Sequence, residues 1–370
     1  MLRWDVFCRV IDNFGDIGVC WRLCAALAAR EQSVRLWVDD ASALAWMAPD
    51  GCVGVEVRRW LPNLPMPLDV PPGDVVIEAF GCDVDHTWIA MNTVASSADS
   101  MPAIAIKGLK NPVWINLEYL SAESFAERSH GLASPVMAGA AMGLTKWFFY
   151  PGFTAGTGGL IRHGNAVVDL PSHANSGHIS LFCYEPSALQ ALIEQLAERN
   201  GATQLLVMAG RGQKALDAVI QSKNAHSPAW NIRGALSINE QLYMSQLHYD
   251  ALLRSCELNF VRGEDSLVSA LWAGRAFVWQ IYPQDDGAHA AKLEAFLEWL
   301  QAPPDLREFH RVWNGLHSGP LPALQIAAWT ACALAARARL LAQRDLVSQL
   351  LDFVEEKAAA ASHSSRSAAI

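Results

Sequence analysis

The stretch "RVIDNFGDIGVCWRL" (residues 9–23) decides how the chain begins to fold. It overlaps the apolar run "WDVFCRV" (4–10), which predicts a strand, and leads into "GVCWRLCAALAAR" (18–30), which predicts a helix. A strand, a glycine-containing turn and a helix are typical of phosphate-binding sites, because free N–H groups at a helix N-terminus attract anions. This turn instead carries two carboxylates, Asp12 and Asp16, which would repel a phosphate.

The size and composition of the chain indicate a folded protein of two domains. Its 370 residues exceed what one hydrophobic core usually supports, and hydrophobic residues make up 52% against 18% charged residues. The net charge of -9, without a basic stripe, argues against a nucleic-acid partner and fits a basic partner better.

Cysteine and histidine usage gives no sign of a metal site. The eight cysteines are scattered among apolar neighbours without a CxxC pair, and the eleven histidines lack ligand spacing. We therefore expect buried thiols in a reducing compartment, with neither disulfides nor a metal.

No stretch of the sequence predicts export or membrane insertion. The segment "MLRWDVFCRV" lacks the apolar core of a signal peptide, and "LQIAAWTACALAA" (324–336) is too short to span a bilayer. The expectation is a cytoplasmic protein without a membrane partner.

Apolar runs alternate with helical patterns throughout the first half, which predicts a parallel sheet wrapped by helices. Expected helices are 18–30 and 41–48, and expected strands are 4–10, 33–40, 53–60, 74–81, 102–108 and 113–120.

A glycine-rich loop (150–165) and a polar stretch (171–178) then predict a domain boundary. A second α/β series follows, in which "CELNFVRGEDSLVSALWAG" (256–274) predicts a strand, a loop and a helix. The segment 322–357 has the periodicity of a long helix. The other expected elements are strands at 179–184, 203–210 and 275–283 and a helix at 186–200.

The predicted architecture is two Rossmann-like α/β domains facing a central cleft. The N-terminal domain covers 1–172, with a C-terminal helix at about 336–357 packing back on it, and the C-terminal domain covers 176–335. The tail 358–370 is low in complexity and predicts disorder. Ligands are expected in the cleft, beyond the carboxyl ends of the strands.

The sharpest phosphate-binding candidate is "NFVRGEDSLVSALWAG" (259–274). Arg262 ends an apolar strand, Gly263 permits a close turn, and Asp265 and Ser266 stand where a helix begins. An arginine at a buried strand end needs an anionic partner, and with free N–H groups it could hold a diphosphate. The alternative is that Asp265 or Ser266 simply caps the helix.

Aromatic residues gather around this candidate at predicted strand ends and loops. Aromatic rings can stack on a nucleobase and a glutamine can read its amide edge, so a nucleotide suits this half. Ordinary packing remains the alternative for each ring taken alone. The residues are Phe182, Tyr184, Tyr243, Gln246, Tyr249 and Tyr282.

If the phosphates bind to the second domain, the acidic turn of the first domain need not bind phosphate and can have another role. Asp12 and Asp16 would then face the cleft from the opposite side, as a general base and an orienting group. The alternative is that one of them only caps the helix that begins near Ile17.

Five longer motifs resemble those of the protein-arginine rhamnosyltransferases of elongation factor P, the EarP family. They are "IDNFGDIGVCWRL", "WINLEYLSAE", "PGFTAGTGGL", "SLFCYE" and "LNFVRGEDS…WAGRAFVWQIYPQ", spread over the chain to about residue 285. The resemblance implies a GT-B fold and an inverting, metal-independent transfer of L-rhamnose from dTDP-β-L-rhamnose to an arginine nitrogen of elongation factor P. The modified factor would then be active in rescuing polyproline-stalled ribosomes.

The resemblance also assigns roles to individual residues. Asp12 and Asp16 correspond to catalytic aspartates, with Asp16 favoured as the base, and Glu264 to a glutamate required for activity. Asn13, Phe14 and Gly15 belong to the loop beside the cleft. Phe182, Tyr184, Tyr243, Gln246, Tyr249 and Tyr282 correspond to the nucleotide-sugar pocket, and Arg262, Asp265 and Ser266 to ribose and diphosphate contacts. No cofactor or metal is implied.

Two rival functions stay open on the residues alone. One is a GT-B transferase acting on a small molecule or lipopolysaccharide, and the other is a non-enzymatic nucleotide-sugar binding protein. The binding protein would not need Asp12 and Asp16 together. Two short matches carry little weight, since "TAGTGG" (154–159) lacks the lysine of a P-loop and "DVD" (83–85) is only three letters long.

Overall fold

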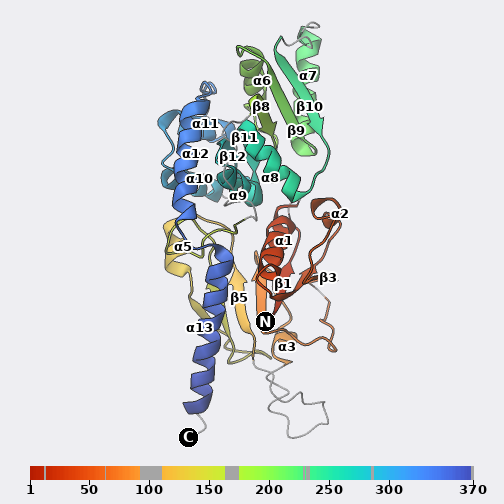
Figure 1. Cartoon of the computed structure of the whole chain (residues 1–370), viewed down its shortest axis with the longest axis vertical. Helices are drawn as coiled ribbons and strands as arrows, with labels where there is room; N and C mark the ends of the chain where they lie inside the picture. The colour runs from red at the N-terminus through yellow and green to blue at the C-terminus, as the bar shows by residue number, and fades with distance from the viewer. Residues whose placement is uncertain are drawn as a thin grey trace. The chain divides into compact units, whose positions relative to one another are not determined.

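Two mainly parallel β-sheets, one in each of two compact units, carry the fold (Figure 1). The computed structural model describes residues 1–11, 14–62, 64–91, 111–162, 175–227, 230, 234–284 and 287–367, with side chains as far as residue 360. The first unit comprises Met1–Arg162 and Gln343–Ile370, and the second comprises His163–Ala342.

The sheet of the first unit has the strand order β3-β2-β1-β4-β5-β7-β6, and all its pairs are parallel except β6 with β7. The alternation of strands and helices in the sequence predicts this parallel pairing. The expected strand at 102–108 lies outside the described residues. The strands are β1 (Arg3–Cys8), β2 (Ser33–Val38), β3 (Val55–Arg59), β4 (Val75–Ala79), β5 (Val113–Leu117), β6 (Ala133–Pro135) and β7 (Thr145–Phe149), and the helices are α1 (Gly15–Ala28), α2 (Leu44–Met47), α3 (His86–Ile89), α5 (Ser124–Ser129) and α13 (Leu346–Ser367).

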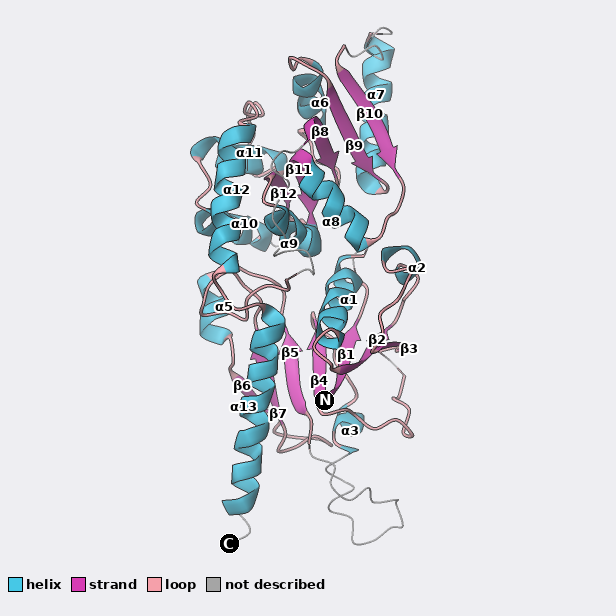
Figure 2. Cartoon of the chain, viewed as in Figure 1, coloured by secondary structure: helices cyan, strands magenta, loops and turns pink. Residues whose placement is uncertain are grey.

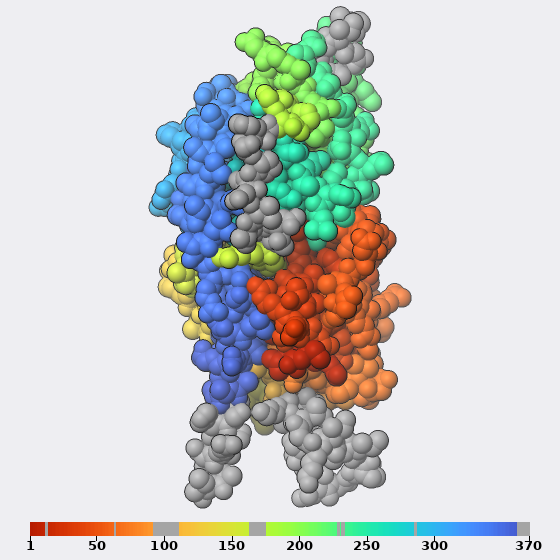
Figure 3. Space-filling model, viewed as in Figure 1, coloured from red at the N-terminus to blue at the C-terminus, as the bar shows by residue number. Residues whose placement is uncertain are grey.

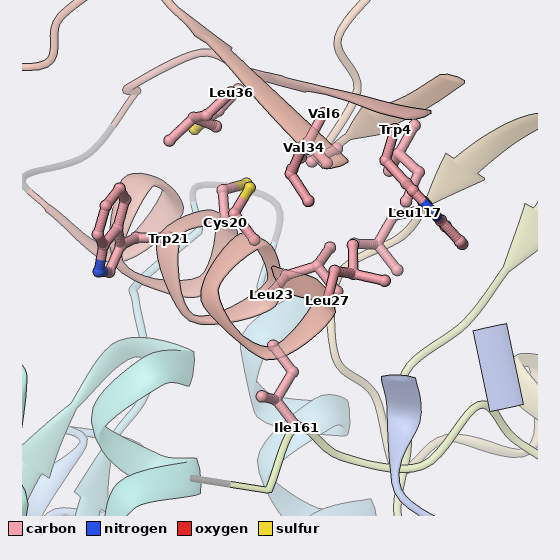
Figure 4. Close-up of a cluster of buried hydrophobic side chains, with 14 of the residues drawn as sticks. Trp4, Val6, Cys20, Trp21, Leu23, Leu27, Val34, Leu36, Leu117 and Ile161 are labelled. Carbon is pink, nitrogen blue, oxygen red and sulfur yellow. The ribbon is translucent and has the colours of Figure 1, made fainter. Parts of the chain in front are cut away.

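Helix α1 packs on one face of this sheet through a stripe of small and aliphatic side chains. Cys20, Leu23 and Leu27 are buried and three or four residues apart, so they lie on one side of the helix. Figure 4 shows them directed toward Val6 of β1 and Val34 of β2. The apolar helix pattern that follows the acidic turn therefore forms the core on which that turn rests.

The C-terminal segment differs from the single helix predicted over 322–357. It forms α12 (Ile326–Leu341) in the second unit and α13 in the first, interrupted where the Asp345 carboxylate accepts the N–H of Ser348 at 3.1 Å and so caps α13. Burial alone would raise the pKa of Asp345, but hydrogen bonds from Ser348 hold it below its usual value.

Helix α13 starts ten residues later than the predicted 336 and continues to Ser367, beyond the predicted end at 357. Alanine is the best helix former, so the run "AAAA" at 358–361 extends the helix into the segment predicted to be disordered. Leu346, Val347, Leu350 and Val354 join the buried core around α1, and Figure 3 shows the blue helix lying against the red N-terminal segments.

The second unit is built on a five-stranded parallel sheet with the order β10-β9-β8-β11-β12. Its helices α10, α11 and α12 gather beside β12 (Figure 2). The strands are β8 (Asn175–Leu181), β9 (Thr203–Met208), β10 (Leu236–Gln241), β11 (Cys256–Arg262) and β12 (Ala276–Gln280), and the remaining helices are α6 (Leu189–Ala197), α7 (Arg211–His226), α8 (Gln246–Ser255), α9 (Gly263–Ala273), α10 (Ala288–Leu300) and α11 (Pro304–Trp313).

The start of β8 and the junction of β11 with α9 are among the points at which this unit differs from the sequence expectations. β8 begins at Asn175 rather than 179, because its polar first residues lie at the exposed start of the strand. No loop separates β11 from α9, since Gly263 has a positive φ of 64° and turns the chain into the helix at once. The predicted boundary at 172–176 falls mainly in residues outside the described ranges, whereas the two units divide after Arg162.

The edge strand β12 forms hydrogen bonds with α11 and with Asn314, the residue that follows this helix, in place of a further strand. His310 Nε2 accepts the Trp279 N–H at 3.0 Å, and the Asn314 side chain accepts the Ile281 N–H and donates to the Trp279 carbonyl, each at 2.9 Å. Burial lowers the pKa of His310 to about 4, so the ring is neutral when it accepts this N–H. The carboxyl end of β12 is therefore held in place.

A buried ion pair fixes the opposite face of the first sheet. Asp5 is fully buried in β1 and accepts two hydrogen bonds from Arg35 at 2.6 Å each. It also accepts the Trp37 indole N–H and the Gly73 N–H, both at 2.7 Å. Four charge-assisted or neutral donors satisfy one carboxylate, which ties β1 to β2 and to the segment before β4.

We predict that Asp5→Ala lowers the free energy of unfolding by about 3–5 kcal/mol, because it leaves the Arg35 guanidinium buried without its counterion. Urea denaturation followed by tryptophan fluorescence measures this loss. Glu56→Gln serves as the control, since the Arg58–Glu56 pair is exposed and is worth less than about 1 kcal/mol. Equal losses in the two variants would contradict the prediction.

His310 predicts a pH-dependent stability. Its pKa is about 4 in the folded protein against the usual 6.5, so the unfolded chain binds more protons between these values. The free energy of unfolding should therefore fall as the pH drops from 6.5 to 4, by roughly 3 kcal/mol from this residue. Denaturation across this range should show a shallower fall for His310→Gln than for the wild type. Parallel curves would refute the assignment.

Candidate functional site

The carboxyl ends of β8, β11 and β12 bring three predicted site segments together at one edge of the second sheet. β11 pairs in parallel with β8 on one side and with β12 on the other. Residues that leave these strands at 182–185, 262–264 and 281–282 are therefore neighbours, as expected for ligand binding in such sheets. We call this group the donor edge.

Arg262 lies at the centre of the donor edge and is only 6% exposed. Its Nη1 donates to the Cys183 carbonyl at 3.3 Å. Its Cζ lies 4.3 Å from the centroid of the Phe182 ring and 4.7 Å from that of Tyr184. The hydrogen bond and the two cation–π contacts hold the guanidinium in place. The positive charge of Arg262 therefore lies where the sequence predicts a phosphate contact.

Helix α9 begins directly beside this guanidinium. Arg262 occupies its N-cap position and forms no side-chain cap, so Asp265 and Ser266 are not the N-cap residue. The Ser266 hydroxyl donates to the Arg262 carbonyl one turn earlier. The positive end of the helix dipole thus adds to the charge of Arg262.

The aromatic residues form two contacting pairs. The rings of Phe182 and Tyr249 lie 5.9 Å apart and those of Tyr184 and Tyr282 lie 5.6 Å apart, both edge to face. The Tyr184 N–H donates to Gln280 Oε1 at 2.8 Å, which fixes the segment after β8. Phe182, Tyr184 and Tyr282 therefore belong to the donor edge, whereas Tyr249 contacts it from helix α8 and not from a strand end or loop as the sequence predicts.

Tyr249 carries a buried hydroxyl beside Ser266 that makes no hydrogen bond of normal geometry. Burial raises its pKa, and the neighbouring Ser266 hydroxyl only partly opposes this effect. Tyr243 is 53% exposed between β10 and α8, and Gln246 is the first residue of α8. These two are placed near the start of that helix rather than within the ring pairs.

Glu264 also lies in the first turn of α9, and Lys292 Nζ donates to its Oε1 at 2.5 Å. Sequence reasoning did not find Lys292, since 28 residues separate the partners and no motif connects them.

A second ion pair at the donor edge was also missed. Arg211 binds Glu185 through two hydrogen bonds of 2.8 and 2.6 Å, and its Cζ lies 5.2 Å from the Tyr184 ring centroid. Hydrogen bonding to Arg211 lowers the pKa of Glu185. The sequence feature that could have indicated Arg211 is "AGRG" (209–212), a glycine-flanked turn between the strand β9 and the helix α7.

The acidic turn lies at the carboxyl end of β1 in the first unit. Asp12 and Asn13 lie outside the described residues. Asp16 lies in the first turn of α1, and its Oδ2 accepts the Ile11 N–H at 3.1 Å. Phe14 is the N-cap residue of α1, followed by the exposed Gly15, and its ring contacts Trp46 of α2 with centroids 5.1 Å apart.

The same edge of the first sheet holds a carboxyl that the sequence did not single out. Glu118 follows β5 and accepts a hydrogen bond from the Asn116 amide at 2.5 Å. Burial raises the pKa of Glu118. Tyr119 next to it stacks on Phe80, which follows β4, with ring centroids 4.8 Å apart. Acidic and aromatic groups thus line the carboxyl ends of β1, β4 and β5.

Two further properties concern the described part of the chain. It holds no cluster of three or more histidine, cysteine, aspartate or glutamate side chains arranged to bind a metal ion. None of its helices combines the length and the apolarity needed to cross a bilayer.

Comparisons with known proteins identify the family of the chain. The model of the family described as Elongation-Factor P (EF-P) rhamnosyltransferase EarP matches residues 4–355. A protein-arginine rhamnosyltransferase of Pseudomonas putida is 39% identical over 345 residues, which cover 84% of this chain and 86% of that protein.

Solved structures are also similar to this chain. A structure concerned with EarP-mediated arginine glycosylation of translation elongation factor EF-P aligns with a TM-score of 0.58 and 25% identity, covering 96% of this chain and 99% of that one. MurG of Acinetobacter baumannii aligns with a TM-score of 0.50 at 10% identity over 96% and 99% of the two chains, which concerns the fold alone. The fold is that of the GT-B glycosyltransferases, and the chain belongs to the EarP family of elongation factor P rhamnosyltransferases.

Proposed function

We propose that this enzyme transfers L-rhamnose from dTDP-β-L-rhamnose to an arginine side-chain nitrogen of elongation factor P, with inversion at the sugar carbon. The second unit binds the donor and the first unit binds the protein acceptor in the cytoplasm. The rhamnosylated factor then acts on ribosomes stalled at polyproline. The observation that carries the proposal is the fixed guanidinium of Arg262 at the start of α9, in a chain of this family.

The donor edge fits a nucleoside diphosphate. Arg262 and the N-terminus of α9 offer charge and N–H donors to the two phosphates. The Ser266 hydroxyl and Asp265 lie in the same turn and are proposed to contact the phosphates or the ribose. Rings such as Tyr249 and Phe182 provide surfaces for the thymine base, and the amide of Gln246 complements its edge.

The same groups supply what the leaving group needs. As the bond between the sugar carbon and the diphosphate oxygen breaks, negative charge grows on the phosphates. A preorganised guanidinium and the dipole of α9 stabilise this charge without a metal ion. The transfer is therefore proposed as metal-independent, with no cofactor.

The acceptor is an unusual nucleophile, because a guanidinium stays protonated with a pKa above about 12. Asp16 and Asp12 can bind it as a fork and accept a proton while the new C–N bond forms. Attack from the face opposite the leaving dTDP gives the α-linked product. Asp16, in the first turn of α1, is favoured as the base because of the motif that the chain shares with the family.

Two other functions predict different results. A GT-B transferase for a small acceptor would leave elongation factor P unmodified, and a nucleotide-sugar binding protein would bind the donor without turnover. Family membership favours the protein-arginine transfer over both.

We expect Arg262→Gln to weaken dTDP binding roughly 10- to 100-fold, because a charge-assisted contact to the diphosphate contributes about 1.5–3 kcal/mol. Isothermal titration calorimetry with dTDP and with thymidine measures the effect. Thymidine lacks the phosphates, so its affinity serves as the control and should change little. An unchanged dTDP affinity would exclude Arg262 as a phosphate contact.

Elongation factor P incubated with the enzyme and dTDP-rhamnose should gain the mass of one deoxyhexose, and replacement of its acceptor arginine should abolish the gain. Asp16→Asn should slow the transfer at least about 100-fold, in line with the loss of a general base, while dTDP affinity is kept. Transfer at the wild-type rate by Asp16→Asn would reject Asp16 as the base.

A further inference from the structure

A carboxylate in the donor edge raises an electrostatic question. Glu264 lies two residues after Arg262, in the same first turn of α9 that is proposed to face the diphosphate. An uncompensated negative charge there would oppose a bound dianion. The Lys292 ammonium meets this carboxylate at 2.5 Å, and the two side chains are only 20% and 21% exposed.

Lys292 lies on helix α10, whose position is stabilised by other contacts. In the first turn of α10, His289 Nδ1 accepts the Gln284 N–H at 3.1 Å, in the segment that follows Tyr282. Two residues after Lys292, Glu294 accepts two hydrogen bonds from Arg311 of α11, at 2.7 and 2.9 Å. Lys292 therefore approaches Glu264 from a helix anchored on both sides.

Helix α11 in turn is bound to β12. His310 and Asn314 connect it to the backbone at Trp279 and Ile281, next to the donor-edge residue Tyr282. His289 and Lys292 are three residues apart and so share one side of α10. One side of α10 therefore contacts both the segment after Tyr282, through His289, and the Glu264 carboxylate, through Lys292.

We propose that Lys292 is a positioning residue that neutralises and orients Glu264, so that the start of α9 accepts a nucleoside diphosphate. The inference rests on the proposed function, since it takes the donor to be a dTDP sugar. Loss of Lys292 leaves the Glu264 charge beside the diphosphate. Loss of both side chains removes the charge that opposes binding.

The test compares dTDP with thymidine on the full-length chain by isothermal titration calorimetry. Lys292→Gln should weaken dTDP binding about tenfold and leave thymidine binding within about threefold, because only dTDP carries the repelled charge. Lys292→Arg should stay near the wild type. The double variant Lys292→Gln/Glu264→Gln should regain dTDP affinity to within about threefold of the wild type, a rescue that an effect of packing alone would not give.

The Arg199–Glu257 pair provides a matched control. Its atoms are 2.8 Å apart, its side chains are 28% and 16% exposed, and Glu257 lies at the opposite end of β11 from Arg262. Arg199→Gln should leave dTDP affinity within about twofold. Thermal unfolding of each variant shows whether all of them remain folded.

The outcomes separate the two claims. If the wild type fails to bind dTDP, the proposed donor is wrong and this inference falls with it. If the wild type binds dTDP but Lys292→Gln binds it equally well, or the double variant stays as weak as Lys292→Gln, only the role of Lys292 is overturned.

Discussion

The contact between Arg262 and the segment after β8 is the constraint on which the donor edge depends. A guanidinium that is 6% exposed must find partners inside the protein, and here the Cys183 carbonyl and the rings of Phe182 and Tyr184 provide them. Because β8 and β11 are adjacent, this contact fixes two strand ends with one side chain. The chain then turns into α9 without a loop, so little freedom remains between the cation and the helix N-terminus.

Side chains also replace a neighbouring strand at the edge of this sheet. A sixth strand beside β12 would form hydrogen bonds with its backbone, but His310 of α11 and Asn314, which follows this helix, do so instead. Gln280 at the end of β12 then accepts the N–H of Tyr184. Helix α11 is thereby connected, through the edge strand, to the residues proposed to contact the donor.

Local sequence patterns could predict the elements but not the contacts between them. Apolar runs predicted β1, β2, β4 and β9 within a few residues, because each such strand is short and buried. The motif around Arg262 was found because strand, glycine and helix are contiguous there.

Contacts between residues that are far apart in the chain could not be predicted in this way, because no local sequence pattern connects the two partners. The pairing of Lys292 with Glu264 and the bond from Trp279 to His310 join residues about thirty positions apart on different elements. The break between α12 and α13 was missed for a related reason. Helical periodicity continues across it, while the Asp345 cap stops α13 from extending further toward its N-terminus.

The strand–helix turns after β1 and after β11 differ in which groups surround their backbone N–H groups. At the end of β1, the Val10 N–H donates to Asp39 at 2.9 Å and the Ile11 N–H donates to Asp16 at 3.1 Å. Carboxylates of the protein thus take donors that a phosphate-binding turn would offer to its ligand. At the end of β11, a buried arginine precedes the helix instead, and the acid that follows is matched by a lysine. The same kind of strand–helix turn thus carries opposite charge in the two units, as the proposed cationic acceptor and anionic donor would require.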